Sequence, residues 1–270
     1  MSEMIDKQAI ARSFGKAADK YDSVAHFQRW VCAGLLDKIP ELISWDVGCS
    51  NLLDLGCGTG SFYPALRHAL SPSNFVGVDL SENMVRHAAS LQGDAQWMVG
   101  DAENLPIRDN SVDLIFSSLA IQWCGDLPSL FDEANRVLKS GGLFVFSSLV
   151  DGSLDELKRA WAKVDGMQHV NAFSSIESYQ DVIDHSPLNI RRLEVEKKVL
   201  YYKKVSELTR ELKTLGAHNM TSHRSTTLTG KSRVRKFLAE YETFRLDDGT
   251  LPASYQVLWG VLSKPVRRET

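Results

Sequence analysis

Cysteines and metal-binding patterns are sparse in this sequence. There are only four cysteines, at positions 32, 49, 57 and 124, and no two of them form a C-x-x-C pair. This usage is typical of reduced thiols in a cytoplasmic protein and argues against a disulfide framework. The seven histidines are scattered without the spacing of metal ligands, so we expect no metal site.

Long apolar runs and a large excess of one charge are also absent. No apolar run reaches the ~18 residues that cross a bilayer, and the polar, amphipathic N-terminus lacks the apolar core of a signal peptide. We therefore expect a cytoplasmic chain with no membrane partner. A net charge of −3 gives no overall attraction to nucleic acid or to acidic membranes, so we expect no nucleic-acid partner.

What the sequence does contain is the composition of a globular protein. Its 270 residues, 43% hydrophobic and 24% charged, suit one large domain with a cap, or at most two domains, and we expect a monomer. Hydrophobic patterns predict strands near 51–55, 74–79, 95–99, 112–117 and 142–149 and helices near 60–70, 82–90, 127–139 and 153–165. This alternation favours an α/β fold, with a parallel sheet and helices on both faces.

Further elements flank this core. Two amphipathic helices are expected at about 3–20 and 24–35. Late strands near 192–202 and 255–262 would complete a seven-stranded sheet with an antiparallel member. Helices are also expected near 204–215 and 230–241.

The most informative segment is the run L-L-D-L-G-C-G-T-G from Leu52 to Gly60. It predicts a buried strand that ends in a glycine-rich turn, where the backbone can approach a ligand closely. Asp79 follows the second strand about 20 residues later, where a carboxylate can accept hydrogen bonds from ribose hydroxyls. A nicotinamide dehydrogenase would share these features.

Two details favour a different ligand. The glycine spacing is G-x-G-x-G rather than the G-x-G-x-x-G of dinucleotide sites, and Asp54 stands two residues before the first glycine. A carboxylate there would repel a pyrophosphate, but it suits S-adenosylmethionine, which carries a sulfonium cation and an amine. Asp101 follows the third strand, where an acid can accept a hydrogen bond from the adenine amine.

These motifs are expected to meet in one cleft, because ligands of parallel sheets bind at the carboxyl ends of the strands. The runs D-L-G-C-G-T-G, V-D-L-S and G-D-A-E-x-L-P resemble the class I methyltransferases. That resemblance implies a Rossmann-like seven-stranded sheet, a helical cap and S-adenosylmethionine as cofactor. The predicted cofactor-binding residues are Asp54, Gly56, Cys57, Gly58, Gly60, Asp79, Leu80, Met84, Asp101, Ala102, Glu103 and Ser117.

Other runs narrow the resemblance. They include A-I-Q-W-C at 120–124, G-S-L at 152–154, His169-x-Asn171-x-Phe173 and Leu212-Lys213-x-x-Gly216. Nearly end to end, the chain resembles the malonyl-[acyl-carrier protein] O-methyltransferases of bacterial biotin synthesis, although Ser118 stands where that family commonly has asparagine. The implied division is 1–40 for N-terminal cap helices, 41–152 for the cofactor-binding core, 153–235 for a cap insertion that contacts substrate, and 236–270 for the end of the last helix and the last strand.

The resemblance also implies the reaction, in which a methyl group passes from S-adenosylmethionine to the free carboxylate of malonyl-acyl-carrier protein or malonyl-CoA. A carboxylate, with a reference pKa near ~4, is ionised at neutral pH. No catalytic acid or base is therefore expected, and catalysis would rest on positioning and the exclusion of water. Arg224 is the predicted clamp of the substrate carboxylate, because a planar guanidinium matches a carboxylate.

Four residues are expected to form the lid over the methionine end and the sulfonium: Tyr21, Gln28, Gln122 and Trp123. An acidic carrier protein needs a basic docking surface, for which we favour the cluster Lys231, Arg233, Arg235 and Lys236 over a second cluster at 197–204.

Two other functions stay open. One is methylation of another small carboxylic acid or a quinone precursor, and the other is a non-catalytic S-adenosylmethionine-binding protein whose cap holds a partner.

Overall fold

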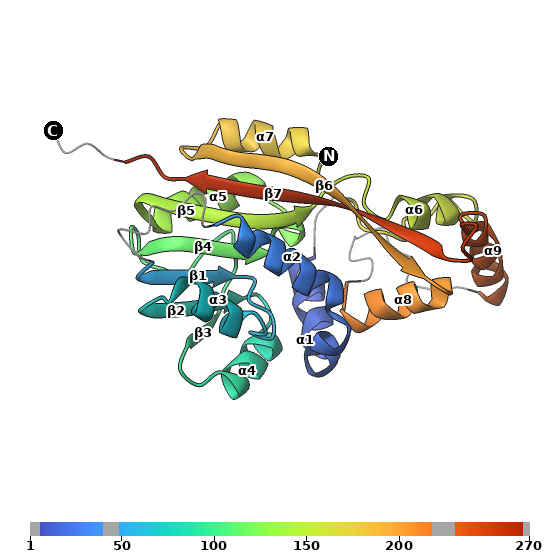
Figure 1. The fold of residues 1–270 in the computed structure, drawn as a ribbon, viewed down its shortest axis with the longest axis horizontal. Coiled ribbons are helices and arrows are strands. Elements are labelled where there is room, and N and C mark those ends of the chain that lie inside the picture. Colours follow the sequence, from blue (N-terminus) through green and yellow to red (C-terminus); the bar gives the residue numbers. More distant parts are fainter. Residues whose placement is uncertain (1–5, 40–48, 218–229, 267–270) are drawn as a thin grey trace.

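The computed structural model describes residues 6–39, 49–217 and 230–266. Together they form a seven-stranded sheet of order β3-β2-β1-β4-β5-β7-β6 (Figure 1). The strands are β1 Asn51–Leu55, β2 Asn74–Asp79, β3 Gln96–Val99, β4 Val112–Ser118, β5 Leu138–Leu149, β6 Asn189–Tyr202 and β7 Leu251–Ser263. β1 to β5 are parallel, and β7 runs antiparallel to both β5 and β6. The predicted α/β class, with seven strands and one antiparallel member, is confirmed.

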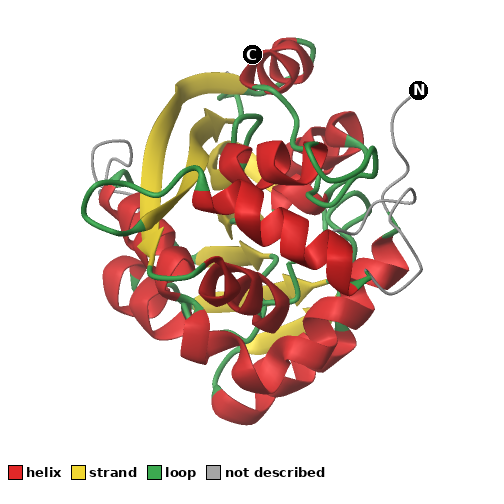
Figure 2. Cartoon of the chain, turned by 90° about the vertical axis from the view of Figure 1, so that its right-hand side faces the viewer, coloured by secondary structure: helices red, strands yellow, loops and turns green. Residues whose placement is uncertain are grey.

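Helices cover both faces of the sheet (Figures 1 and 2). Leu52 of β1 packs in the cluster formed with α2 (His26–Asp37) and α3 (Tyr63–Leu70). The next residue, Leu53, packs in the cluster formed with α5 (Leu127–Val137) and α7 (Ile176–Asp184). Successive side chains of a strand point to opposite faces, so continuous apolar strands supply a core on each side. The remaining helix of this region, α4 (Glu82–Leu91), lies beside β2 and β3.

The last strand begins at Leu251 rather than near 255, and the predicted boundary between α5 and β5 is wrong. The helix expected over 127–139 ends at Val137, and Leu138 already belongs to β5, where it pairs with Val112 of β4. The register shifts after that pair, and the chain passes through Gly141 at a φ of 78°. Lys264 donates to the carbonyl oxygens of residues 135 and 138, at 2.6 and 2.8 Å. This cation satisfies carbonyls at the end of α5, which a longer helix would have satisfied internally.

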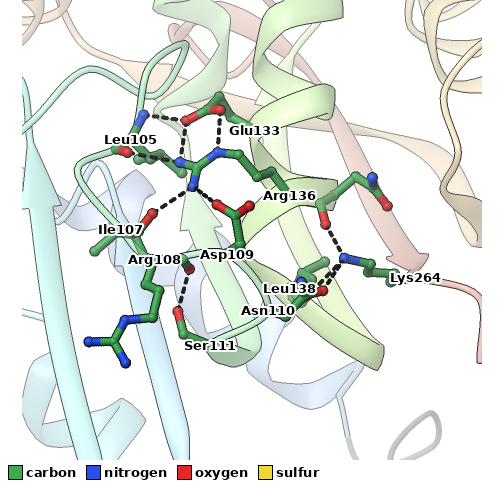
Figure 3. Close-up of polar contacts among 11 residues, drawn as sticks. Leu105, Ile107, Arg108, Asp109, Asn110, Ser111, Glu133, Arg136, Leu138 and Lys264 are labelled. Atoms are coloured by element: carbon green, nitrogen blue, oxygen red, sulfur yellow. Dashed lines mark hydrogen bonds and ion pairs between the residues drawn. The ribbon is translucent and has the colours of Figure 1, made fainter.

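Arg136, near the end of α5, holds the loop that follows β3 (Figure 3). Its guanidinium donates to the carbonyl of Leu105 at 2.9 Å and pairs with Asp109 and Glu133, each at 2.6 Å. Glu133 in turn accepts a hydrogen bond from the amide of Leu105 at 2.5 Å. Charge-assisted bonds of this kind are among the stronger ones in proteins, so the segment 105–109 is anchored to α5.

A cap of three helices sits on the outer half of the long β6–β7 pair (Figure 1). These helices are α6 (Asp155–Ala162), α8 (Val205–Thr214) and α9 (Lys231–Glu242). The ladder that carries them runs from Asn189 opposite Ser263 to Tyr202 opposite Leu251, with one register shift between Ile190 and Arg192. Glu156 of α6 is bound to this ladder, because it accepts from the amide and the hydroxyl of Ser254, at 3.0 and 2.6 Å.

The first helix, α1 (Lys7–Val24), lies between the core and the cap, against α4 and α8 (Figure 1). Ser13 donates to the carbonyl of Gly216 at 3.0 Å. A Cβ at Gly216 would come within 2.9 Å of the Ser13 carbonyl oxygen, so glycine permits this close approach. In the described ranges, no helix has both the length and the apolarity to span a bilayer.

A test of the core concerns Gly260 on β7. A Cβ there would lie 2.1 Å from the ring of Phe146, which is completely buried on β5. Gly260→Ala should lower the free energy of unfolding by about 1–3 kcal/mol through overpacking. Gly93→Ala is the control, because its Cβ would meet no atom within 4 Å. Urea unfolding curves of both variants measure the difference, and equal midpoints would contradict this packing.

Candidate active site

The glycine-rich turn after β1 is closely packed on one side and open on the other. Gly56, Gly58 and Gly60 all have positive φ, between 53° and 75°. A Cβ at Gly56 would lie 2.2 Å from Ala120, and one at Gly60 would lie 2.8 Å from Trp97. A Cβ at Gly58 would meet nothing within 4 Å. The turn is therefore fixed by its neighbours, while its middle glycine faces open space.

Asp79, at the end of β2, holds this turn in place. Its carboxylate accepts from the amide of Gly58 at 2.9 Å and from the amide of Ser81 at 2.8 Å. Burial raises the pKa of Asp79, and these two amide bonds act in the opposite direction. Each carboxylate oxygen can accept a second hydrogen bond, so Asp79 has acceptor capacity for a ligand hydroxyl.

The acids after β3 are bound by a residue that the sequence analysis did not select. Lys7, at the start of α1, pairs with Asp101 at 2.6 Å and with Glu103 at 2.5 Å. Burial lowers the pKa of Lys7, but its bonds to the two acids outweigh this effect and raise it. Glu103 also accepts from the amide of Gly125 at 2.7 Å. Only its contact with Asp101, 94 residues away in the chain, marks Lys7 as a residue of the site.

The other end of α1 also contacts the turn. The Thr59 hydroxyl donates to Asp22 at 2.9 Å. Beside Asp22, burial and the charges of Asp79 and Asp22 raise the pKa of the Tyr21 phenol, which therefore stays protonated at neutral pH. Tyr21 cannot serve as a base under these conditions. α1 is thus attached to the glycine turn at its end and to the acids after β3 at its start.

A cavity of about 120 Å³, here called the cofactor cavity, lies under α1 at the carboxyl ends of the strands. Most of the predicted cofactor residues line it: Gly56, Cys57, Gly58, Asp79, Leu80, Met84, Asp101, Ala102 and Glu103. From α1 come Lys7, Ile10, Phe14 and Tyr21. Ser118, the last residue of β4, and Trp123, from the segment after it, also line the cavity. The structure thus gathers the glycine turn, three of the predicted acids and α1 around one space.

Three of the predicted residues lie outside the lining of this cavity. Gly60 packs against Trp97, as described above. Ser117 is completely buried and donates to the carbonyl of Leu55 at 2.8 Å, so it connects β4 to β1, and its neighbour Ser118 lines the cavity instead. Asp54 is only 2% exposed and its Oδ2 has no hydrogen-bond partner in the described chain. Burial, with a contribution from Asp79, raises the pKa of Asp54 to about 8.

A second cavity of about 180 Å³, here called the substrate cavity, adjoins the first. All four predicted lid residues line it: Tyr21, Gln28, Gln122 and Trp123. It shares Phe14, Tyr21, Leu119 and Trp123 with the cofactor cavity. The rings of Phe14 and Trp123 meet edge to face at 5.2 Å. Aromatic side chains therefore border the junction of the two cavities, and aromatic faces attract cations.

Several buried oxygens around the two cavities have no hydrogen-bond partner in the described chain. They are Gln28 Oε1, Asp54 Oδ2, Ser118 Oγ and Gln122 Oε1. Buried polar atoms in native proteins are usually satisfied, so these acceptors fit a ligand that brings hydrogen-bond donors and positive charge. S-adenosylmethionine has both, in its amine and its sulfonium, and the residues present thus fit this cofactor.

Other predicted site residues lie elsewhere. Lys231, Arg235 and Lys236 are exposed on α9, and Arg233 is half-buried and pairs with Asp165 at 3.4 Å. Arg224 lies outside the described residues. No cluster of three metal-ligating side chains occurs within the described ranges.

Comparisons with known proteins identify relatives over most of the chain. Residues 53–146 match the family model described as a methyltransferase domain. The chain is 42% identical to the biotin biosynthesis bifunctional protein BioHC of Cellvibrio japonicus, over 98% of this chain and 52% of that protein. It thus spans about half the length of that relative. It is 34% identical to the malonyl-[acyl-carrier protein] O-methyltransferase of Nitrosospira multiformis, over 98% of this chain and 91% of that protein.

The fold is shared with solved structures of low sequence identity. The YcgJ protein of Bacillus subtilis superimposes with a TM-score of 0.58 at 22% identity, over 87% of this chain and 100% of that chain. This similarity supports the architecture alone.

The protonation of Asp54 gives a pH-dependent prediction. In the free protein Asp54 is largely protonated below its pKa of about 8, whereas a cationic cofactor favours the carboxylate. Binding should therefore release a proton, and affinity for S-adenosylmethionine should rise from about pH 6 to about pH 7.5, by up to about tenfold per pH unit. Calorimetry in buffers of different ionisation enthalpy measures the released proton.

The matched variants separate Asp54 from other acids. Asp54→Asn should bind more weakly at the higher pH and lose the pH dependence. Glu82→Gln is the control, because Glu82 is an exposed acid on α4 that pairs only with Arg86 among the ion pairs of the described chain. An unchanged pH slope in Asp54→Asn would rule out this assignment.

Proposed function

The chain belongs to the family of malonyl-[acyl-carrier protein] O-methyltransferases, and we propose that it methylates the free carboxylate of a malonyl group carried by acyl-carrier protein. The observation that carries this proposal is the junction of two cavities beneath α1. One is lined by the glycine turn and the acids that suit S-adenosylmethionine, and the other by cap and lid residues. A donor and an acceptor bound in adjoining cavities can react in line without exposure to solvent.

Binding of the methyl donor is assigned to the cofactor cavity. When bound, S-adenosylmethionine supplies an activated methyl group on a sulfonium. We infer that Asp79 accepts hydrogen bonds from ribose hydroxyls and Asp101 from the adenine amine, as the motifs predict. Asp54 supplies negative charge toward the methionine amine once its proton has left. Leu80 and Met84 offer apolar surface for the adenine ring.

The reaction needs no proton transfer at the nucleophile, because the malonyl carboxylate is already ionised at neutral pH. This chain must therefore orient the substrate carboxylate, exclude water from it and supply a positive charge beside it. Lys213 and His169 are the basic side chains that line the described part of the substrate cavity. We propose Arg224 as the principal clamp, on the strength of its place in the family pattern.

One acid also lines the substrate cavity and could oppose an anionic substrate. Burial raises the pKa of Glu211, and its hydrogen bond from the Tyr202 hydroxyl, at 3.2 Å, acts in the other direction. The net rise means that Glu211 resists ionisation compared with an exposed glutamate. Glu211 therefore repels a malonyl carboxylate less than a fully ionised glutamate would.

The direct test is the mass of the acyl group. Incubation with S-adenosylmethionine and malonyl-acyl-carrier protein should add one methyl group to the malonyl group. Acetyl-acyl-carrier protein is the control and should gain none, because it has no free carboxylate. Methylation of both, or of neither, would contradict the proposed reaction.

The same assay tests the clamp. Arg224→Ala should lower the rate of methyl transfer by about 100-fold, because the loss of a buried charge partner costs several kcal/mol, and should leave the affinity for S-adenosylmethionine within about twofold. Arg210→Ala, at an exposed position of α8, should change neither quantity. Equal rates for Arg224→Ala and the parent would exclude Arg224 from the site.

We further propose that the carrier protein docks on α9, through the exposed residues Lys231, Arg235 and Lys236. Reversing two charges, with Arg235→Glu and Lys236→Glu together, should lower kcat/KM for malonyl-acyl-carrier protein by about tenfold or more. Malonyl-CoA, which has no protein to dock, should be methylated at an unchanged rate. If both substrates respond alike, or neither does, docking on α9 is excluded. Arg233 is left unaltered, because it pairs with Asp165.

A further inference from the structure

A third cavity, here called the outer cavity, lies on the other side of the wall of the substrate cavity. It has a volume of about 230 Å³. It shares five lining residues with the substrate cavity: Trp161, His169, Val170, Asn171 and Phe173. The same side chains therefore border both spaces, and the outer cavity, the substrate cavity and the cofactor cavity follow one another from the surface to the glycine turn.

The wall between the outer and substrate cavities is an ordered stack of rings. Trp161 of α6 lies between His169, at a ring distance of 3.7 Å, and Phe237 of α9, at 4.3 Å. The His169 ring donates from Nε2 to Asp165 at 2.8 Å. Asp165 also pairs with Arg233. The side chains that form and fix this stack thus come from α6, from α9 and from the segment between α6 and α7.

Three of the five shared wall residues, Trp161, His169 and Phe173, present flat rings, which can line a narrow passage and contact an extended chain of methylene and amide groups. At the mouth, Met167 is 45% exposed, and Ala172 is exposed as well. Arg233 lies 3.9 Å from the Met167 sulfur. The start of α9, with its exposed basic residues, is therefore next to the mouth of the outer cavity.

One cation lies at the rim of the outer cavity. Lys158 of α6 lines it, with 29% of its side chain exposed. Its ammonium stands 3.4 Å from Asp151 and 5.5 Å from the ring of Phe173. Asp151 is the acid at this rim and is 71% exposed. An exposed pair at that separation is weak, and an ammonium has three donors, so Lys158 can bind another anion.

We propose that the outer cavity is the entrance for the phosphopantetheine arm of the substrate, with Lys158 binding its phosphate. This inference rests on the proposed function, because a carrier-bound or CoA-bound malonyl group arrives on such an arm. The phosphate stays at the rim by Lys158, the pantetheine chain passes the Trp161–His169 stack, and the malonyl end reaches the substrate cavity. The carrier protein then sits over the start of α9.

The decisive experiment compares two substrates that differ in one phosphate: malonyl-phosphopantetheine and malonyl-pantetheine. Lys158→Ala should lower kcat/KM for the phosphorylated substrate by about tenfold, as expected for the loss of a charge-assisted bond, mainly through KM. The same variant should leave kcat/KM for malonyl-pantetheine within about twofold. Lys163→Ala is the matched control directly after the same helix, because Lys163 is 63% exposed, pairs with Glu240 and does not line the outer cavity.

Outcomes that overturn the proposal are distinct. Equal losses for both substrates would mean that Lys158 acts on something other than the phosphate, and no loss for either would remove it from the arm. If the parent enzyme methylates neither substrate nor any other malonyl thioester, the proposed function itself fails. Malonyl-CoA and malonyl-acyl-carrier protein, assayed in parallel, should both respond to Lys158→Ala, whereas the α9 charge reversal should affect the carrier-bound substrate alone.

A second variant tests the path of the arm. Ala172→Trp places a large ring at the mouth, where the arm would lie throughout the bound state. It should raise KM by about tenfold or more for malonyl-phosphopantetheine. A short malonyl N-acetylcysteamine thioester leaves the mouth empty once bound, so its KM should stay within about twofold. Ala89→Trp, at an exposed position of α4, is the control. Equal effects on the long and short substrates, or none, would overturn the path.

Discussion

Like charges gathered at the carboxyl ends of parallel strands are the constraint on which this site depends. Asp54, Asp79 and Asp101 stand at the ends of three neighbouring strands; Asp54 is buried and the other two are half-buried. The free protein relieves the repulsion differently at each acid. Burial keeps Asp54 protonated near neutral pH, two backbone amides hold Asp79, and Lys7 pairs with Asp101. A cationic ligand is favoured because it offers a further source of positive charge.

α1 connects this electrostatic arrangement to the substrate side. Its start is bound through Lys7 and its end through the hydrogen bond between Thr59 and Asp22. Between these points Phe14 and Tyr21 line both cavities. The helix that neutralises the acids is therefore the same helix that roofs the junction, so changes in charge at the cofactor cavity and changes in shape at the substrate cavity act on one element.

Sequence patterns predicted those parts of the molecule that depend on local chemistry. The glycine spacing gave the turn, and the alternation of strands and helices gave the sheet and its antiparallel member. The contacts of Lys7 could not be predicted, because its partner Asp101 lies 94 residues away. Ser117 and Ser118 could not be told apart as cavity residues, because one residue decides which face of β4 a side chain occupies. The start of β5 was misplaced because Leu138 joins β4 before the bulge at Gly141.

The long ladder of β6 and β7 has a mechanical consequence. Because β6 and β7 pair with each other beneath the cap helices, and β7 also pairs with β5 of the core, these two strands offer no loop hinge about which the described cap helices could swing as a rigid body. Exchange of reactants must then use passages through the cap or shifts of individual helices. Opening of the cap would then rest on local movement of its helices, while the paired strands β6 and β7 stay in place.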